Sequence, residues 1–256
     1  MKITNNHVYV IAEIGINHEG SVNECVKMIN EAANFGASAV KLQTINADAN
    51  YVLDSESYKT FKGSELTPEE TADMFKLAKS KGLDIFTTAG DIETIKWVDK
   101  LHPSCWKISS GLLTHIPLIS YLASLGRPLL ISTGMAIQDE IDLAIKTVRA
   151  AGNNDISLLQ CTSLYPAPLD SLNLKIIKSL KRKYKCNVGF SDHSLGTDAA
   201  FLSVGAGAMI IEKHFSLDPG RVGFDHKISL NAADFKVMVE RIRMAEIIMG
   251  SSEKVA

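Results

Sequence analysis

Two stretches near the C-terminus, NVGFSDH at residues 187–193 and AMIIEKH at residues 208–214, each pass from apolar residues into a polar tail that ends in histidine. Each apolar part predicts a short buried strand, because runs of this length are typical of strands covered on both faces. Six earlier apolar runs end in the same way, at Glu13, Lys41 with Gln43, Thr88, Ser110, Ser132 and Ser163. Eight strands that end in polar side chains predict one shared catalytic rim.

Segments with helical spacing and recognisable ends lie between these runs. Ser21 and Glu24 form a capping box for a helix that closes at Gly36, and Thr67-Pro68-Glu69-Glu70 opens a helix that closes at Gly82. Further helices are expected near 91–101, 116–125, 137–151, 171–184, 196–206 and 231–249. The two long connections, 45–66 and 215–230, are expected to be loops that could cover the rim.

Strict alternation of eight strands with eight helices requires parallel strands joined by right-handed crossovers. Two architectures satisfy this requirement, a closed barrel and an open, doubly wound sheet. A dinucleotide-binding open sheet would carry G-x-G-x-x-G after its first strand, whereas the turn GINHEG at 15–20 lacks that spacing. Eight units in about 250 residues favour a (β/α)8 TIM barrel, with a closed, parallel, eight-stranded sheet. We therefore expect one catalytic domain over residues 1–250 and a short tail over 251–256.

The composition indicates a small-molecule partner. With 27 basic and 29 acidic side chains the net charge is −2, which gives no excess of positive charge for nucleic acid or an anionic membrane. No apolar stretch reaches the roughly 18 residues of a spanning helix, and the N-terminus lacks a signal-peptide core, so a cytoplasmic location is expected. The cysteines at 25, 105, 161 and 186 form no CxxC pair, which is typical of reduced, buried thiols.

Lys41 and Lys107 lie within apolar strands, where an unpaired ammonium group would be costly to bury. Hydroxyl-bearing turns follow the neighbouring strands. Lysines, hydroxyls and backbone amides together predict a cradle for an anion that carries phosphate and carboxylate. Glu13 is interpreted either as a base or hydroxyl anchor of this site or as the salt-bridge partner of a neighbouring lysine.

His193 and His214 end two strands that should be neighbours in the barrel. Two imidazoles there could bind a divalent transition metal and leave positions for water and substrate oxygens, although no HxH or HExxH pattern is present. Side chains alternate along a strand, so Glu212 should face the interior together with His214. Asp225, in the connection after the last strand, could hold a metal-bound water.

The motifs at these strand ends closely resemble those of the bacterial sialic acid synthase family, which includes legionaminic and pseudaminic acid synthases and spore coat polysaccharide synthases. The matching segments are AEIGINHEGS (12–21), VKLQT (40–44), WKI (106–108), ISTGM (131–135), CTSLYP (161–166), SDHS (191–194), EKHF (212–215) and DHK (225–227). The resemblance runs in order from about residue 9 to 245. Eight ordered matches are far more specific than any single motif.

The resemblance implies a metal-dependent transferase that condenses phosphoenolpyruvate with an N-acylated amino sugar, such as N-acetylmannosamine or a dideoxy relative. The products would be a nine-carbon 2-keto sugar acid of the sialic acid type and phosphate. A divalent metal, Mn²⁺ or a similar ion such as Mg²⁺ or Co²⁺, would be bound by His193 and His214, with Asp225 holding a coordinated water. Phosphoenolpyruvate would be bound by Lys41, Thr88, Lys107, Ser110, Ser132, Ser163 and Ser191, the sugar by Gln43 and Tyr165, and Glu13 would contact the reacting groups.

The sequence departs from the family pattern at several positions. Leu112 stands where the family usually has an acidic residue that reaches a sugar hydroxyl, Ala89-Gly90 replaces a Pro-Phe pair, and Ser163 replaces an asparagine. The antifreeze-like C-terminal domain, which in the family supplies a sugar-binding arginine and helps to form the dimer, is expected to be absent after residue 250. The resemblance leaves a homodimer open.

Two other functions remain open. A Schiff-base aldolase would use Lys41 or Lys107 as its nucleophile, but it would leave the paired histidines without a role. A catalytically silent sugar-binding paralogue, suggested by Leu112, would bind ligand without releasing phosphate.

Overall fold

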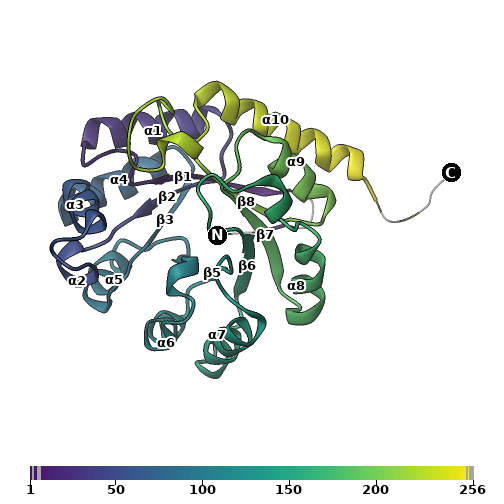
Figure 1. The fold of residues 1–256 in the computed structure, drawn as a ribbon, viewed down its shortest axis with the longest axis horizontal. Helices are drawn as coiled ribbons and strands as arrows, with labels where there is room; N and C mark the ends of the chain where they lie inside the picture. The colour runs from purple at the N-terminus through teal and green to yellow at the C-terminus, as the bar shows by residue number, and fades with distance from the viewer. Residues whose placement is uncertain (2, 5–6, 252, 254–256) are drawn as a thin grey trace.

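The computed structural model describes residues 1, 3–4, 7–251 and 253. Eight parallel strands form one closed barrel in chain order, and helices surround it (Figure 1). The strands are β1 (Tyr9–Gly15), β2 (Ala39–Gln43), β3 (Asp84–Thr88), β4 (Trp106–Ile108), β5 (Leu129–Ser132), β6 (Ile156–Cys161), β7 (Asn187–Asp192) and β8 (Ile210–His214). The predicted (β/α)8 barrel is therefore confirmed, while most of the tail predicted at 251–256 lies outside the described residues.

The outer layer follows the predicted alternation. Its main helices are α1 (Val22–Asn34), α4 (Pro68–Ser80), α5 (Ile92–Asp99), α6 (Ile116–Ser124), α7 (Gln138–Ala150), α8 (Ile176–Tyr184), α9 (Asp198–Gly205) and α10 (Ala232–Met249). Half of the capping box predicted at Ser21 and Glu24 is present: Ser21 Oγ accepts from the Glu24 N–H at 3.3 Å, whereas the Glu24 carboxylate pairs with Lys27 and Arg221. In the second predicted capping box, Thr67 and Glu70 cap each other at 3.1 and 2.8 Å.

Two helices were not predicted. The connection expected as a loop over 45–66 contains α2 (Ala47–Asn50) and α3 (Glu56–Gly63). Asn46 and Ser55 cap these helices through their side chains, and Tyr51 stacks on Phe61 with ring centroids 5.0 Å apart. The prediction of a plain loop was therefore wrong here, because side-chain caps and one aromatic contact supply the order that the apolar pattern does not show.

The helix expected from residue 171 begins later, at Ile176, because η2 (Leu169–Ser171), a 3-10 turn, precedes it and Asn173 adopts a left-handed backbone with φ of 47°. The second long connection, 215–230, is irregular as predicted, apart from the 3-10 turn η3 (His226–Ile228). A third such turn, η1 (Ser110–Leu112), follows β4.

The apolar residues form two separate clusters. The larger one lies between the barrel and the helices, and the smaller one fills the lower part of the barrel bore with Tyr9, Ile11, Ala39, Phe86, Cys105, Leu130, Leu159 and Ile210, none more than 6% exposed. Above this plug, the inward-facing positions of the same strands carry polar side chains. Cys25, Cys105 and Cys161 are buried and Cys186 is half-buried, and all four are free thiols, as expected.

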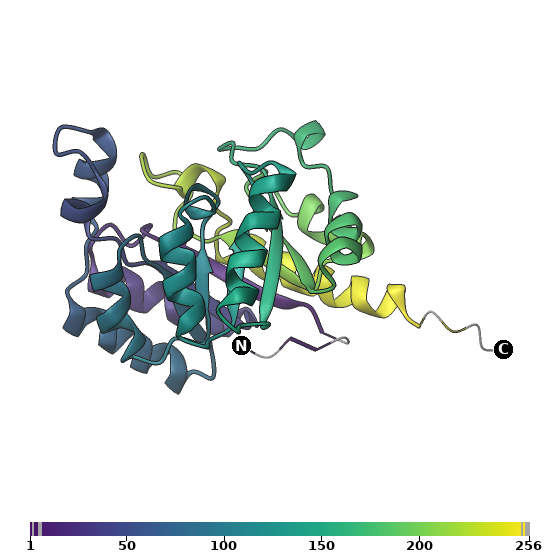
Figure 2. The ribbon, with the colours of Figure 1, turned by 90° about the horizontal axis from the view of Figure 1, so that it is seen from below.

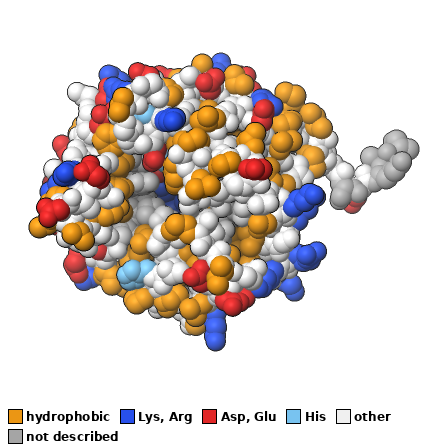
Figure 3. Space-filling view, viewed as in Figure 1, with side chains coloured by type: hydrophobic (Ala, Val, Ile, Leu, Met, Phe, Trp, Pro, Cys, Tyr) orange, Lys and Arg blue, Asp and Glu red, His pale blue; other side chains and the backbone are white. Residues whose placement is uncertain are grey.

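The carboxyl ends of the strands form an open mouth. In the side view the α2–α3 segment and the loops after β6 and β8 rise on one side of the barrel, and the N-terminus lies on the other (Figure 2). The space-filling view along the barrel shows a hollow at the centre of this mouth (Figure 3). No helix in the described part of the chain has both the length and the apolar character needed to cross a membrane.

Candidate active site

A cavity of about 290 Å³ lies at the mouth of the barrel. It is lined by Glu13, Lys41, Gln43, Lys107, Ser109, Ser110, Gly111, Ser132, Met135, Cys161, Ser163, Tyr165, Ser191, His193, Glu212 and His214. Every residue predicted for the site lines this cavity except Thr88 and Asp225. The strand ends thus bring together side chains that are up to 201 positions apart in the sequence, since 214 − 13 = 201.

Two buried ion pairs stand at the base of the cavity. Lys41 Nζ donates to Glu13 Oε1 at 2.6 Å, and these two residues are direct neighbours on β2 and β1. Lys107 Nζ donates to both carboxylate oxygens of Glu212, at 2.9 and 3.1 Å, across the bore from β4 to β8. All four side chains are at most 5% exposed. Glu13 therefore forms the predicted salt bridge through Oε1, and its second carboxylate oxygen is left for the alternative role as base or hydroxyl anchor.

The two carboxylates differ in their electrostatics. Burial opposes ionisation of both, but the charges of Lys107 and Lys41 lower the pKa of Glu212 to about 2. Burial raises the pKa of Glu13 to about 7, because the attraction of Lys41 offsets only part of that cost and Glu212 repels a second negative charge. Glu212 also raises the pKa of Lys107 against the effect of burial. Two ammonium groups, one carboxylate and one carboxyl that ionises near neutrality leave the site able to accept an anion.

Buried polar atoms without a partner are concentrated here. The described residues contain six such side-chain atoms, and four of them, Glu13 Oε2, Thr88 Oγ1, Ser132 Oγ and His214 Nδ1, belong to residues predicted for the site. Buried polar atoms are normally hydrogen-bonded. Their gathering at one end of the bore indicates a place where ligand or water atoms complete the hydrogen bonding.

Serine hydroxyls approach the cavity from four successive strand ends. Ser191 Oγ donates to Glu212 Oε1 at 2.8 Å, and Ser110 Oγ accepts from the Gly134 N–H at 2.9 Å. A Cβ atom at Gly134 would come within 2.6 Å of Ser163 Oγ and 2.9 Å of Ser110 Oγ. Glycine at 134 is therefore what lets these hydroxyls converge, because any side chain there would push them apart.

The two predicted imidazoles lie side by side. The ring centroids of His193 and His214 are 5.4 Å apart, and Tyr165 stacks on His193 at 4.2 Å. His193 Nδ1 lies 2.9 Å from the Thr162 carbonyl, which fixes Nδ1 as the protonated nitrogen and leaves the lone pair on Nε2. Burial lowers the pKa of His193 to about 4 and that of His214 to about 3. Both rings are therefore neutral at neutral pH, the form that ligates metals.

These features fit a metal held by two protein ligands. His214 Nδ1 is buried and has no partner in the described part of the chain, and the nearest carboxylate oxygen, Asp225 Oδ2, is 3.6 Å away. The described residues contain no group of three His, Cys, Asp or Glu side chains arranged as a metal site. An ion between the imidazoles would thus take its other ligands from water and substrate.

Thr88 and Asp225 stand beside the cavity. Thr88 pairs with both Gln43 and Lys107 in the sheet register, which places it at the level of the site. Asp225 lies in the loop after β8 with its side chain 27% exposed, close to His214, and burial raises its pKa. The predicted proximity of Asp225 to the imidazoles is therefore present.

Several residues at the site were not predicted as part of it. Glu212, Cys161, Ser109 and Met135 all line the cavity, and Met135 is 63% exposed at its edge. Strand alternation already placed Glu212 on the inner face and could also have found Cys161, because each lies an even number of positions from an inward residue. Met135 and Ser109 lie on turns, where no such periodicity exists. Leu112 does not line the cavity; it packs, half-buried, on the outer core.

Fold and site together define a parallel (β/α)8 barrel with its polar centre at the carboxyl ends of the strands, the arrangement of barrel enzymes. The chain belongs to the NeuB family, whose sequence model matches residues 28–254. It is 37% identical to N,N'-diacetyllegionaminic acid synthase of Legionella pneumophila over 96% of this chain and 74% of that protein. Pseudaminic acid synthase of Campylobacter jejuni is 32% identical, over 98% of this chain and 77% of that protein.

A solved structure shares the architecture closely. The N-acetylneuraminic acid (sialic acid) synthetase of Leptospira borgpetersenii, crystallised in complex with citrate, superposes with a TM-score of 0.96 at 31% identity. The match covers all of this chain and 90% of the other. The resemblance found in the sequence is thereby confirmed.

Proposed function

We propose that this protein condenses phosphoenolpyruvate with an N-acylated amino sugar to give a nine-carbon 2-keto sugar acid and phosphate. The main support for this proposal is the arrangement of charged and neutral side chains around the cavity. Two buried lysines, each paired with its own glutamate, face a pair of neutral imidazoles across one cavity of about 290 Å³. This set suits a small, multiply charged anion held beside a polarised carbonyl group. Membership of the NeuB family, and relatives named as sialic, legionaminic and pseudaminic acid synthases, support it.

The lysines supply the anion site. Lys41 and Lys107 would hold the carboxylate and phosphate of phosphoenolpyruvate, with the hydroxyls of Ser110, Ser132 and Ser191 fixing its orientation. The methylene carbon of phosphoenolpyruvate attacks the aldehyde carbon of the open-chain sugar and forms the new C–C bond. Water then adds to the phosphoenolpyruvate carbon that bears the phosphate group. Cleavage of the bond between this carbon and the phosphate oxygen releases phosphate.

Glu13 is suited to the proton transfers. Its Oε1 is fixed by Lys41 at 2.6 Å, while Oε2 is buried and unpaired among the described residues. A carboxyl group with a pKa of about 7 can both give and take a proton near neutral pH. We assign to Glu13 Oε2 the proton exchanged with the attacking water or the sugar oxygen.

His193 and His214 would hold the divalent metal, and we propose Mn²⁺ or a similar ion. When bound, the metal would supply a Lewis acid for the sugar aldehyde. Asp225, close to His214, would orient a water at that side of the site. Tyr165, stacked on His193 and 55% exposed, and Gln43 would form the sugar side of the cavity.

The Schiff-base alternative is less well supported. A nucleophilic lysine must lose its proton, yet Lys41 and Lys107 each donate to a buried carboxylate and the pKa of Lys107 is raised. Borohydride trapping of a substrate on the protein would favour the aldolase over the condensation.

A phosphate-release screen tests the proposal. The protein is incubated with phosphoenolpyruvate, Mn²⁺ and a panel of N-acetylated hexoses and dideoxyhexoses, with chelated metal as the control. Phosphate release that needs both an acceptor sugar and the metal supports the proposal. Ligand binding without release from any acceptor would instead identify a silent sugar-binding protein.

A further inference from the structure

Asn17 is a buried residue to which neither the site nor the proposed chemistry assigns a role. It lies two positions beyond β1 and is 2% exposed. Its amide is fully used: Nδ2 donates to the Phe215 carbonyl and to Ser229 Oγ, both at 3.0 Å, and Oδ1 accepts from the Asp225 N–H at 3.1 Å. One side chain therefore binds the start, the turn and the end of the 215–230 loop.

These three contacts connect the segments that carry His214 and Asp225, whose side chains face each other at the cavity edge. Phe215 directly follows His214, and the Asp225 carboxylate lies 3.6 Å from the His214 ring. Asn17 therefore connects the backbone of Phe215, the residue after His214, to the backbone of Asp225. Ser229 Oγ in turn donates to the Asp225 carbonyl at 2.6 Å, so Asp225 is held at both its N–H and its C=O.

The turn before Asp225 would not keep this shape by itself. Gly223 and Phe224 adopt left-handed backbone angles, with φ of 90° and 49°. A left-handed conformation costs a non-glycine residue roughly 1–2 kcal/mol. Hydrogen bonds to the residue that follows are needed to hold the strained turn, and the Asn17 amide makes one of them.

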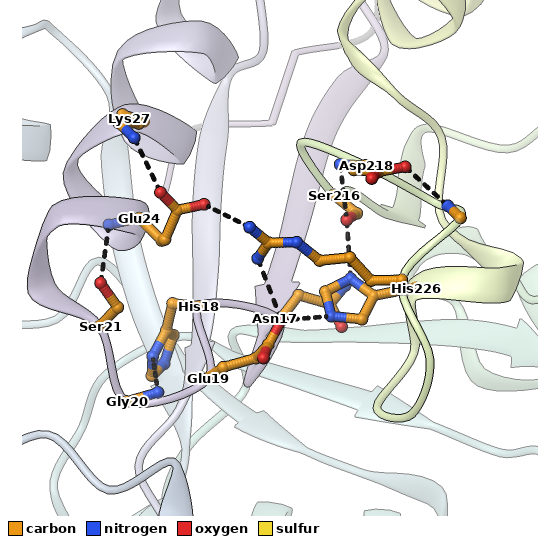
Figure 4. A network of polar contacts seen from close by, with 12 residues as sticks. Asn17, His18, Glu19, Gly20, Ser21, Glu24, Lys27, Ser216, Asp218 and His226 are labelled. Atoms are coloured by element: carbon orange, nitrogen blue, oxygen red, sulfur yellow. Dashed lines mark hydrogen bonds and ion pairs between the residues drawn. The ribbon is translucent and has the colours of Figure 1, made fainter.

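A second buried side chain also attaches the loop: His226 is 0% exposed and lies 3.0 Å from Glu19 Oε1 and 2.7 Å from Ser216 Oγ. The contacts of Arg221 are more exposed. Arg221 donates to Glu19 at 3.0 Å and to Glu24 at 3.2 Å, and its side chain is 39% exposed. Figure 4 shows Glu19 and Glu24 facing the loop segment that carries Ser216, Asp218 and His226. Exposed ion pairs contribute little to stability, and salt weakens them. Of these two buried side chains, Asn17 is the one that bonds the backbone of Asp225 itself and the backbone of Phe215, the residue after His214.

We propose that Asn17 is a positioning residue for the condensation, which sets the place of the Asp225 carboxylate relative to His214. The inference rests on the proposed function, because it assigns Asn17 to the same reaction. It does not require Asn17 to touch either substrate.

A double-mutant cycle tests this role. N17A should lower kcat for phosphate release about 10- to 100-fold, the range typical of residues that orient metal-site groups, with KM for phosphoenolpyruvate changed less than about threefold. D225A should lower kcat at least as much. If Asn17 acts through Asp225, the double variant is no slower than D225A. Losses that multiply in the double variant, or a change confined to KM, would overturn the inference.

The chain offers a matched control in Asn153. Its Nδ2 donates to the Arg127 and Ala123 carbonyls at 2.8 and 3.4 Å, and its Oδ1 accepts from the Asp155 N–H at 3.0 Å, at the opposite end of the barrel. N153A should lower stability about as much as N17A and leave kcat unchanged. Equal kcat losses in N17A and N153A would reduce Asn17 to a structural residue and contradict the proposal.

Hydrogen exchange separates this inference from the proposed reaction. Without substrate, N17A should speed amide exchange in residues 217–226 about tenfold or more, whereas N153A should not. Absence of phosphate release from the parent protein would refute the proposed function, and the exchange result would still show whether Asn17 holds Asp225. Unchanged exchange in N17A would overturn the positioning role whatever the activity.

Discussion

Glu212, Lys213 and His214 are consecutive residues of β8 that serve opposite faces of the sheet. Glu212 and His214 face the cavity, while Lys213 points outward and pairs with Asp192 at 2.9 Å, with both side chains fully buried. Alternation along the strand predicts this division from the sequence. It does not predict that Glu212 is the partner of Lys107, because β4 and β8 lie on opposite sides of the bore and only the closed barrel sets that distance.

His214 offers a direct test of the metal site. H214A should abolish metal binding and lower phosphate release by roughly 100-fold or more, because one of only two imidazole ligands is lost. Its Nδ1 makes no hydrogen bond within the described residues, so the fold should survive. Bound Mn²⁺ is measured after dialysis, beside H102A, an exposed histidine at the opposite end, as the control. Undiminished activity of H214A in metal-free buffer would rule out this role.

Lys107 tests the anion site. K107M removes charge-assisted hydrogen bonds, so KM for phosphoenolpyruvate should rise about 10- to 100-fold and KM for the sugar much less. Initial-rate measurements with each substrate varied in turn separate the two constants. K100M, at an exposed lysine beyond α5, is the matched control. Kinetic constants equal to those of the parent would contradict the assignment of Lys107 to the anion.

At the scale of elements, the sequence predicted the helices and strands whose apolar pattern and end signals point to the same structure. All eight strands and the eight main helices were expected near their observed positions. The short helices α2 and α3 were missed, because they have few turns and α3 buries no residue, so no amphipathic periodicity marks them. Their order depends on local caps and on one aromatic contact that sequence spacing does not reveal.

The buried ion pair between Lys213 of β8 and Asp192 of β7 should contribute to the free energy of unfolding rather than to substrate binding. K213M leaves the Asp192 carboxylate buried without its cation and should cost about 3–5 kcal/mol in the free energy of unfolding. Urea denaturation measures this loss, with the exposed Lys236 changed to Met as the control. Adding D192N to K213M should recover part of the loss. Equal midpoints for K213M and K236M would show that the pair contributes nothing.

At the scale of the whole molecule, barrel closure explains which parts of the site could be predicted. Side chains on strand ends were predicted to converge, and they do, because each strand ends at the same mouth. The 215–230 loop has no periodicity, so the sequence suggested a role for Asp225 only through the motif and did not show that Asn17 holds it. That arrangement depends on contacts between residues 208 positions apart.

The stability of the fold should fall as the pH is lowered. Burial lowers the pKa of His18 and His193 to about 4 and that of His214 to about 3, below the usual 6.5. Between pH 6.5 and 4 the unfolded chain binds protons that the folded chain excludes, at roughly 1.4 kcal/mol per pH unit for each group. Glu13, with its pKa raised from 4.5 to about 7, and Asp225, whose pKa burial also raises, act in the opposite direction, but these two groups oppose three.

Urea denaturation between pH 6.5 and 5 checks this slope. H18Q should flatten it without touching the proposed metal ligands. A free energy of unfolding that stays constant or grows as the pH falls would contradict the prediction.

The apolar plug closes the lower bore beneath the cavity. Phe86, Leu130 and Leu159 seal the floor, the lysines lie just above them, and Tyr165 stands at the rim. In the proposed reaction, phosphoenolpyruvate seated on the lysines must therefore bind before the sugar. The two substrates should bind in a compulsory order. A dead-end analogue of the sugar should then be an uncompetitive inhibitor with respect to phosphoenolpyruvate.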